Sequence, residues 1–306
     1  MDYAGSALLV TGWSLVILGL LEGVVAWGWG SPAGIAVLTA GLAALAAFVV
    51  VERRAAEPVV PLWVFRRRLL VGSALTQVGV GALLIGLDSY VPVYAQGVLG
   101  AGAVAAGFAL ATMTIGWPLA STFSGRLYLR IGFRDTSLLG GAVLVASTGL
   151  GMLLSASSTL WTVAAVCFLA GVGLGLIASP TIVAVQSLVG WEERGLVTGT
   201  AMFSRSLGSA VGVAGFGALV TATTTARFRS APAGLRDQLP QSADATGLAL
   251  RPDAAADVVA YVRQALAGAS HAVFVALAAV SVVTVASLLL MPRRSAASSD
   301  AGTAAG

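Results

Sequence analysis

The sequence predicts an all-α integral membrane protein with eight transmembrane helices. Hydrophobic residues make up 58% of its 306 residues and charged residues 10%, whereas soluble domains have roughly 45–50% and about 25%. Seventeen basic and thirteen acidic side chains are too few to solvate a globule of this size, so most of the chain must face lipid. Eight apolar windows are also long enough to cross a bilayer, which takes about 20 residues.

The eight windows follow one another along the chain with few charges inside them. They are residues 3–21, 33–51, 69–87 with an extension to 96, 103–123, two within 136–191 on either side of the Ser- and Thr-rich stretch 155–159, then 195–221 and 272–291. No basic stretch precedes the first window, and the window is too long for a cleaved signal peptide, so we expect it to remain as a helix.

One long loop, residues 222–270, separates the last two windows. Within it, apolar residues recur at helical spacing over 253–267, which predicts a short amphipathic surface helix. The residues on its apolar face are Val258, Val262, Ala265 and Leu266.

The distribution of arginine predicts the orientation in the membrane. With an even number of spans both termini lie on one side, and that side carries eleven arginines, whereas the short loops on the other side carry none. Because basic residues accumulate in cytoplasmic loops, we expect a multi-pass protein of the plasma membrane with both termini in the cytoplasm. Membrane topology also accounts for the net charge of +4, so nucleic acid is not an expected partner.

The residues needed for most enzyme chemistry are missing. The absence of lysine excludes a phosphate-binding loop that ends in Gly-Lys and a Schiff-base enzyme. The single cysteine, Cys167, lies in an apolar run and is expected in the core, and the single histidine, His271, is expected at the outer boundary of the last span. The sequence therefore predicts neither an enzyme nor a metal or organic cofactor.

Four stretches of the chain resemble a known family. They are the helix Asp2–Gly23 with the turn Trp27–Pro32, the linker Glu52–Arg66, the helix end Tyr90–Gln96, and the segment Arg194–Gly208. In this order they resemble the C-terminal part of a Major Facilitator Superfamily transporter of the fourteen-helix drug:proton antiporter type. The resemblance implies two connecting helices in residues 1–51, an Arg-rich cytoplasmic linker in 52–68, a six-helix half in 69–291 and a disordered cytoplasmic tail in 292–306.

The same resemblance implies secondary active transport. The expected activity is efflux of lipophilic, drug-like and also cationic small molecules, with a proton gradient as the energy source. The family builds its cavity between two six-helix halves, and its antiporter signature lies in a first half that this sequence does not contain. Expected partners are therefore the lipid bilayer, a small-molecule substrate, and a missing N-terminal half or a second copy. The alternative is a truncated, non-transporting membrane protein or scaffold of the same fold.

A glycine- and arginine-rich segment, residues 125–134, resembles the second copy of the superfamily's loop signature. Such a loop needs glycines for a tight turn and arginines that bond helix ends and acidic partners. Leu129 stands where the family has Asp, so a gating salt bridge made by that residue is absent. Arginines anchored at lipid headgroups are the alternative interpretation. The residues assigned to the motif are Gly125, Arg126, Arg130, Gly132 and Arg134.

Asp88 is the candidate proton-coupling residue, because ionisable groups at membrane depth are costly and commonly mark a pathway or a proton relay. At 100° per residue, Gln77 points in nearly the same direction as Asp88, and Gly81 and Leu84 lie between them. This face is predicted to line a polar cavity in the substrate pathway. The alternative is that Asp88 lies near the outer interface and is simply hydrated.

Arg205 is a further candidate for the substrate pathway, since it lies ten residues into its span. It would pair with a carboxylate or an anionic substrate, or else extend toward the cytoplasmic interface or bind helix-end carbonyls. Tyr90 and Tyr94 are expected in an interfacial aromatic belt. Three small-residue spacings predict close helix packing. They are Gly171 with Gly175, Gly195 with Gly199, and Gly208 with Gly212.

Overall fold

The computed structural model describes residues 3–25, 31–53, 67–236, 239 and 255–292, and all of its regular structure within these ranges is helical. The long helices are α1 (Tyr3–Val25), α2 (Pro32–Glu52), α3 (Arg68–Gly97), α4 (Ala103–Ile131), α5 (Phe133–Met152), α6 (Leu160–Gln186), α7 (Arg194–Arg229) and α10 (Ala256–Leu288). A 3-10 turn, Trp191–Glu193, precedes α7, and the short helix α8 (Ala233–Arg236) follows it. The predicted all-α fold is confirmed.

Each of the eight predicted windows corresponds to one long helix of the described residues. Six helices in the described part of the chain are long and apolar enough to cross a membrane: α2, α3, α4, α6, α10, and α7 with the turn before it. In α1 the structure describes the side chains of the apolar segment Gly5–Gly19. α5 is not among the six, because Arg134 and Asp135 lie in its first turn and Gly, Ser and Thr interrupt its apolar residues. The chain is a multi-pass membrane protein.

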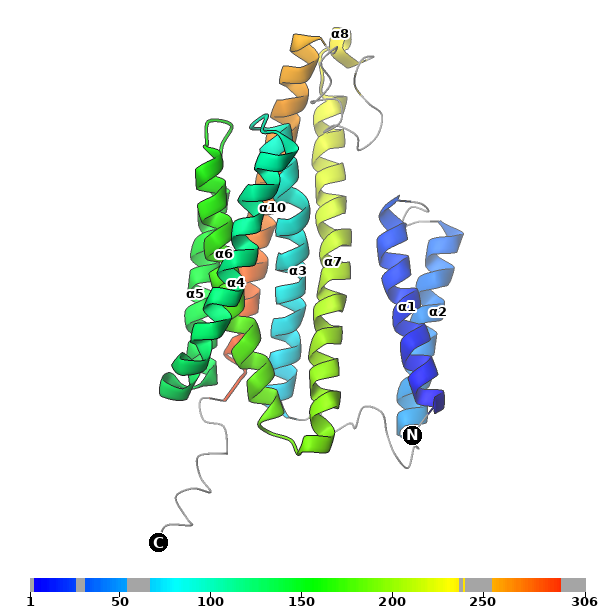
Figure 1. Ribbon diagram of the computed structural model, residues 1–306. Helices are drawn as coiled ribbons and strands as arrows, with labels where there is room; N and C mark the ends of the chain where they lie inside the picture. The colour runs from blue at the N-terminus through cyan, green and yellow to red at the C-terminus, as the bar shows by residue number, and fades with distance from the viewer. Residues whose placement is uncertain (1–2, 26–30, 54–66, 237–238, 240–254, 293–306) are drawn as a thin grey trace.

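The helices α3 to α7 and α10 form one bundle, and α1 and α2 form a hairpin beside α7 (Figure 1). In the bundle α4 and α5 pack on α6, α3 packs on α7, and α10 packs on α3, α5 and α7. The hairpin reaches α7 through Trp13, whose ring centroid lies 4.3 Å from that of Phe203. We call the end at which α3 begins the lower end, and the end at which α3 finishes the upper end, as they lie in Figure 1.

The two helices that flank the predicted loop 222–270 extend into it. α7 continues to Arg229, and α10 begins at Ala256. Residues 256–267 are therefore helical as predicted, but they form the start of α10 and not a short surface helix, and residues 253 and 254 lie outside the described residues. His271 consequently lies inside α10 and not at its start. The helix continues because its N-terminal turns also have a buried apolar face, and Tyr261 donates a hydrogen bond from its hydroxyl to the carbonyl of Arg227 over 2.6 Å. Buried residues of this face are Val258, Val262, Ala265 and Leu266.

Buried hydroxyl pairs tie α10 to its neighbours. Thr76 of α3 and Ser287 bond over 2.8 Å, and Thr148 of α5 and Ser281 bond over 2.9 Å. In a membrane such interhelical bonds stabilise packing by about 0.6 kcal/mol on average. They hold the helix in register at two levels of the bundle.

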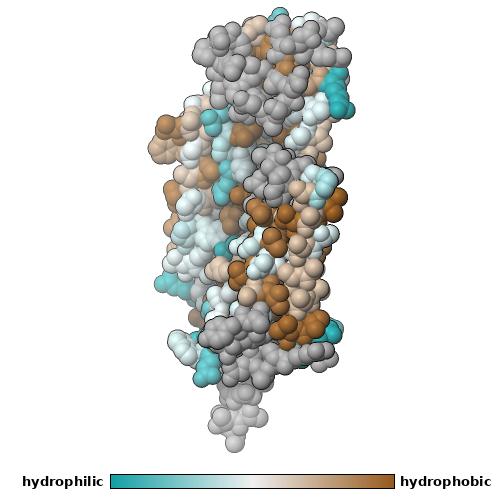
Figure 2. Space-filling model, turned by 90° about the vertical axis from the view of Figure 1, so that its right-hand side faces the viewer, coloured by the Kyte–Doolittle hydropathy of each residue, from teal (hydrophilic) through white to brown (hydrophobic). Residues whose placement is uncertain are grey.

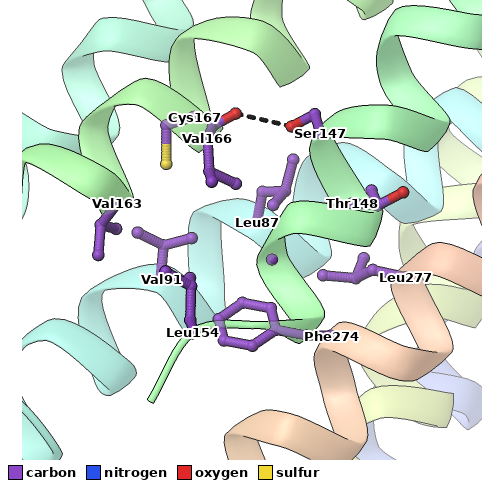
Figure 3. Close-up of a pocket in the computed structure, with 11 residues that line it drawn as sticks. Leu87, Val91, Ser147, Thr148, Leu154, Val163, Val166, Cys167, Phe274 and Leu277 are labelled. Atoms are coloured by element: carbon purple, nitrogen blue, oxygen red, sulfur yellow. Dashed lines mark hydrogen bonds between the residues drawn. The ribbon is translucent and has the colours of Figure 1, made fainter. Parts of the chain in front are cut away.

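The interior between α3, α5, α6 and α10 is tightly packed. Cys167 is buried there, as predicted, and it lines a cavity of about 10 Å³ together with Leu87, Phe274 and Leu277 (Figure 3). Ser147 turns its hydroxyl away to donate to the carbonyl of Val166 over 2.7 Å. A space of this size holds at most one water molecule. This interior therefore has no room for a small organic molecule.

The outer surface carries apolar side chains where lipid would lie. On the side of the α1–α2 hairpin, hydrophobic residues cover much of the middle of the molecule, and hydrophilic ones gather mostly toward its two ends (Figure 2). Exposed apolar side chains of the hairpin include Val10, Leu18, Ile35, Leu42 and Val50. Their exposure to lipid carries no hydrophobic penalty, because acyl chains are as apolar as the side chains themselves.

Candidate functional site

The site is built on a backbone contact between α3 and α7. Gly81 of α3 lies directly against the backbone of Arg205 and Ser209, and Gly208 of α7 lies directly against the carbonyl of Val78. The hydroxyl of Ser209 donates to the carbonyl of Gly81 over 3.1 Å. Only glycine permits helices to approach this closely. The contact places the Arg205 side chain beside α3.

Four side chains from four helices meet at this level, and we call them the Arg205 cluster: Arg205 of α7, Gln77 of α3, Thr181 of α6 and Trp117 of α4. Arg205 donates to Gln77 Oε1 from Nε over 3.2 Å and from Nη2 over 3.0 Å. Gln77 Nε2 donates to Thr181 Oγ1 over 3.4 Å. The guanidinium carbon lies 5.6 Å from the ring centroid of Trp117.

The cluster stabilises a charge that is otherwise costly in a membrane. An arginine at the centre of a transmembrane helix costs about 2.5–3.5 kcal/mol on the insertion scale. Hydrogen bonds to Gln77 and the face of Trp117 offset part of this cost, since a desolvated cation–π contact contributes up to about 2 kcal/mol. Arg205 thus bonds a side chain inside the bundle, and the alternative in which it extends to the interface or binds helix-end carbonyls is wrong.

Asp88 lies apart from the cluster, on the upper half of α3. It follows Gln77 by eleven residues, about 16 Å along the helix axis. Its side chain is exposed, and within the described residues it makes no hydrogen bond or ion pair. At this level its carboxylate is not covered by neighbouring helices.

The stripe predicted from periodicity is not one open wall. Gln77 is fully buried between α6 and α7, Gly81 is in contact with α7, and Leu84 packs partly buried on the core. Of these residues and Asp88, Asp88 alone is exposed. The four residues do share one side of α3, but the neighbouring helices cover that side at the level of Gln77 and Gly81 and leave it open at Asp88.

The tyrosines above Asp88 belong to the packing of the bundle. Tyr94 is 2% exposed; its hydroxyl donates to the carbonyl of Ser155 over 2.7 Å, and its ring meets that of Phe274 edge-on at 5.5 Å. Tyr90 meets Phe216 edge-on at 6.2 Å. The prediction of an interfacial belt is therefore wrong for Tyr94, because the α5–α6 turn supplies a partner for its hydroxyl inside the protein.

The arginine motif forms a helix corner and not an extended loop. α4 ends at Ile131 and α5 begins at Phe133, so Gly132 is the single non-helical residue of the segment 125–134. Its φ of 92° lies in the region that glycine adopts without strain. The other residues of the motif lie on the two helices, Gly125, Arg126 and Arg130 on α4 and Arg134 on α5. In the described part of the chain none of these arginines forms an ion pair with an acidic residue.

The predicted small-residue spacings divide into two kinds. Gly171 and Gly175 of α6 face backbone atoms of α4, as Gly208 and Gly212 of α7 face backbone atoms of α3. These two predictions are confirmed. Gly195 and Gly199 have nothing within 4 Å of where a Cβ would lie, so the third prediction is wrong. They lie on the exposed side of the first turns of α7, while Val197 and Ala201 of the same turns are buried.

Sequence reasoning missed two members of the cluster. Trp117 lies in the middle of a 29-residue helix, far from the membrane interfaces at which tryptophan usually gathers. Its position in the middle of an apolar window, directly before Pro118, was the sequence feature that could have marked Trp117 as a site residue. Thr181 gave no signal, because a threonine inside a helix commonly donates its hydroxyl to its own helix and needs no other partner. In the structure it does so, to the carbonyl of Ile177 over 2.7 Å.

The eight long helices of the described residues, their glycine-mediated contacts and the partly buried Arg205 form a helical membrane bundle. The chain belongs to the Major Facilitator Superfamily, whose family model matches residues 3–213. The solved structure of a bacterial homolog of the human lysosomal transporter Spinster, inward-facing and occupied, superposes with a TM-score of 0.59 at 14% identity, over 92% of this chain and 66% of that one. The predicted superfamily is confirmed.

Several curated proteins are similar in sequence. The multidrug transporter protein MdtP of Bacillus subtilis is 27% identical over 252 residues, which are 82% of this chain and 46% of that protein. The tetracycline resistance determinant of Streptomyces rimosus is 29% identical over 222 residues, 70% of this chain and 62% of that one. An uncharacterized transporter of Mycobacterium tuberculosis, Rv1877, is 30% identical over 235 residues, 76% and 34% respectively. The chain spans about half the length of MdtP.

Proposed function

We propose that this chain is the second six-helix half, with the connecting helix pair, of a proton-coupled exporter of lipophilic, drug-like molecules in the plasma membrane. Relatives named as a multidrug transporter and a tetracycline resistance determinant support export of such compounds. The superfamily is one of transporters, and this supports a transporter in preference to an enzyme. The eleven arginines on the side of the termini support cytoplasmic ends.

The position and exposure of Asp88 are the observations that support proton coupling. Among the described helices it is the one acidic residue more than five positions from a helix end. Its carboxylate is exposed on α3 and has no partner within the described residues, so it is free to bind and release a proton. α3 is about 45 Å long, and Asp88 lies about 8 Å above its midpoint, within a hydrocarbon core about 30 Å thick.

Transport by this fold requires another helix bundle beside the one that this chain forms. Alternating access arises when one helix bundle rocks against another around a site near the bilayer midplane. Here the partner half is either a missing N-terminal six-helix segment or a second copy of this chain. The uncovered carboxylate of Asp88 then faces the cavity between the halves, where outer and inner solvent reach it in turn.

The test is to neutralise Asp88 in the chain expressed together with a first half from a relative such as MdtP. Asp88→Asn keeps shape and hydrogen-bonding capacity but cannot titrate, so we expect pH-driven dye export from everted vesicles to be lost while downhill equilibration persists. Asp88→Glu should retain partial coupling with a shifted pH optimum. Asp257→Asn, a matched loss of a carboxylate in the first turn of α10, should leave coupling unchanged.

Two outcomes would contradict the proposal. Wild-type export by Asp88→Asn would show that this carboxylate is only hydrated and that coupling belongs to another acid. Absence of export with every tested first half and with the chain alone would favour the alternative, a non-transporting membrane protein of the same fold.

A further inference from the structure

We propose that the Arg205 cluster recognises the anionic oxygen of a planar aromatic substrate, so that this half favours aromatic anions over aromatic cations. The inference rests on the proposed function, because it names the class of compound that such an exporter would take. It replaces the expectation of cationic substrates, which came from resemblance alone.

Arg205 has N–H donors that no acceptor within the described residues uses. A guanidinium carries five N–H groups, and two of them are directed at a single acceptor, Gln77 Oε1. Within the described residues the remaining N–H groups have no acceptor, and the side chain is only partly buried. A carboxylate, phenolate or similar oxygen is the group that binds such a fork most strongly.

The guanidinium is held in place before any ligand arrives. Gln77 is fully buried, and its Nε2 donates to Thr181, so its Oε1 must point at Arg205. Thr181 is itself fixed by its bond to the carbonyl of Ile177. The backbone of Arg205 is fixed by its contact with Gly81. Arginines that are oriented in this way lose little conformational freedom on binding, which favours affinity.

Trp117 supplies the aromatic part of the proposed site. Its ring lies 5.6 Å from the guanidinium carbon and is partly exposed, so a planar ligand can contact the indole while its oxygen bonds Arg205. Gly175 of α6 lies against the carbonyl of Trp117, where an added Cβ would be 2.5 Å away, and this contact fixes the backbone that carries the ring.

The charge balance around the cluster also favours an anion. Within the described residues Arg205 has no acidic partner, and the nearest acid along α3, Asp88, is about 16 Å away. Its positive charge is therefore not neutralised by any acid within the described residues. A cationic ligand would meet like charge here, whereas an anionic ligand supplies the missing counter-charge.

Two dyes with the same ring system test the inference. Fluorescein is anionic at slightly alkaline pH and tetramethylrhodamine methyl ester is cationic, and both contain a xanthene with a phenyl substituent. Their binding to the full chain in phosphatidylcholine nanodiscs is measured by fluorescence anisotropy, with empty nanodiscs as the blank. We expect the wild-type chain to bind fluorescein at least about tenfold more tightly, because a hydrogen bond to a charged group contributes about 1.5–3 kcal/mol.

The variants separate charge from geometry. Arg205→Gln should weaken fluorescein binding about 10- to 100-fold and not weaken binding of the cationic dye. Arg205→Lys keeps the charge but loses the planar fork, and should fall between the two. Trp117→Phe should weaken both dyes. The matched control is Arg194→Gln, since Arg194 lies over Trp191 at 5.3 Å in the same kind of contact at the lower end of α7.

The outcomes decide for or against the inference. Equal affinities of the wild-type chain for the two dyes, or fluorescein binding that is unchanged by both Arg205 substitutions, would overturn it and leave Arg205 as a partner for an acid of the other half. Equal losses in Arg194→Gln would overturn it too. If thermal unfolding shows that Arg205→Gln is not folded, Arg205→Lys decides. The assay needs no gradient and no second half, so dye binding without export would refute the proposed function alone.

Discussion

Replacing Gly208 by alanine should separate α7 from α3 and destabilise the protein. A Cβ at this position would overlap the carbonyl of Val78, which belongs to a helix backbone and cannot rotate away. Overpacking of this kind costs about 1–3 kcal/mol. Gly199→Ala is the matched control, because it lies on the same helix and nothing is within 4 Å of its added methyl group.

Comparison with Gly199→Ala removes the contribution of helix propensity from the measured change in stability. Alanine stabilises a helix interior by about 0.5–1 kcal/mol relative to glycine, and this gain is common to both variants and cancels in their difference. We therefore expect Gly208→Ala to be less stable than Gly199→Ala by about 2 kcal/mol in free energy of unfolding. The measurement is SDS-induced unfolding of the purified chain, followed by circular dichroism.

The site should respond together with the helix contact. Gly208 lies one turn beyond Arg205, so movement of α7 also lengthens the bonds between Arg205 and Gln77. Fluorescein affinity should fall in Gly208→Ala and stay at the wild-type value in Gly199→Ala. Equal stability and equal dye affinity of the two variants would refute the backbone contact between α3 and α7.

Further predictions concern topology and the hydroxyl pairs. In a Cys167→Ser background, Ser157→Cys at the upper end should react with a membrane-impermeant maleimide in intact cells, whereas Glu192→Cys at the lower end should not; the reverse pattern would overturn the proposed orientation. In a double-mutant cycle, Thr76→Val and Ser287→Ala should show a coupling of about 0.6 kcal/mol in SDS unfolding. A coupling of zero would mean that their 2.8 Å bond contributes nothing to helix packing.

The sequence was sufficient for the eight long helices of the described residues and for the two charged residues of interest. Asp88 and Arg205 could be found because a single charge within an apolar window is conspicuous. Helix ends were less predictable. An apolar window stops where polar residues begin, but a helix continues for as long as one face is buried, and for this reason α7 and α10 both extend beyond their windows.

The partners of Arg205 could not be predicted from periodicity. A 3.6-residue repeat gives the direction of a side chain about its own helix axis. It does not say which other helix lies in that direction, and Gln77 is 128 residues away in sequence. The same limitation explains the three glycine spacings, which look alike in the sequence and of which only two lie at a helix contact.

Because Gln77 and Asp88 lie on one unbroken helix, α3 holds the proposed proton site and the proposed anion site at a fixed separation. At about 16 Å and an effective dielectric constant of about 20, two unit charges interact by about 1 kcal/mol. Protonation of Asp88 removes a negative potential of this size from the ligand position beside Arg205, and so strengthens anion binding about fivefold. Binding of a proton at Asp88 and binding of an anion beside Arg205 then strengthen each other. An exporter that exchanges a proton for an anion needs the opposite coupling, in which binding of the proton weakens binding of the anion. In the proposed exporter the other half must therefore supply the reversal, for instance through an acid that approaches Arg205 when the cavity changes the side to which it opens.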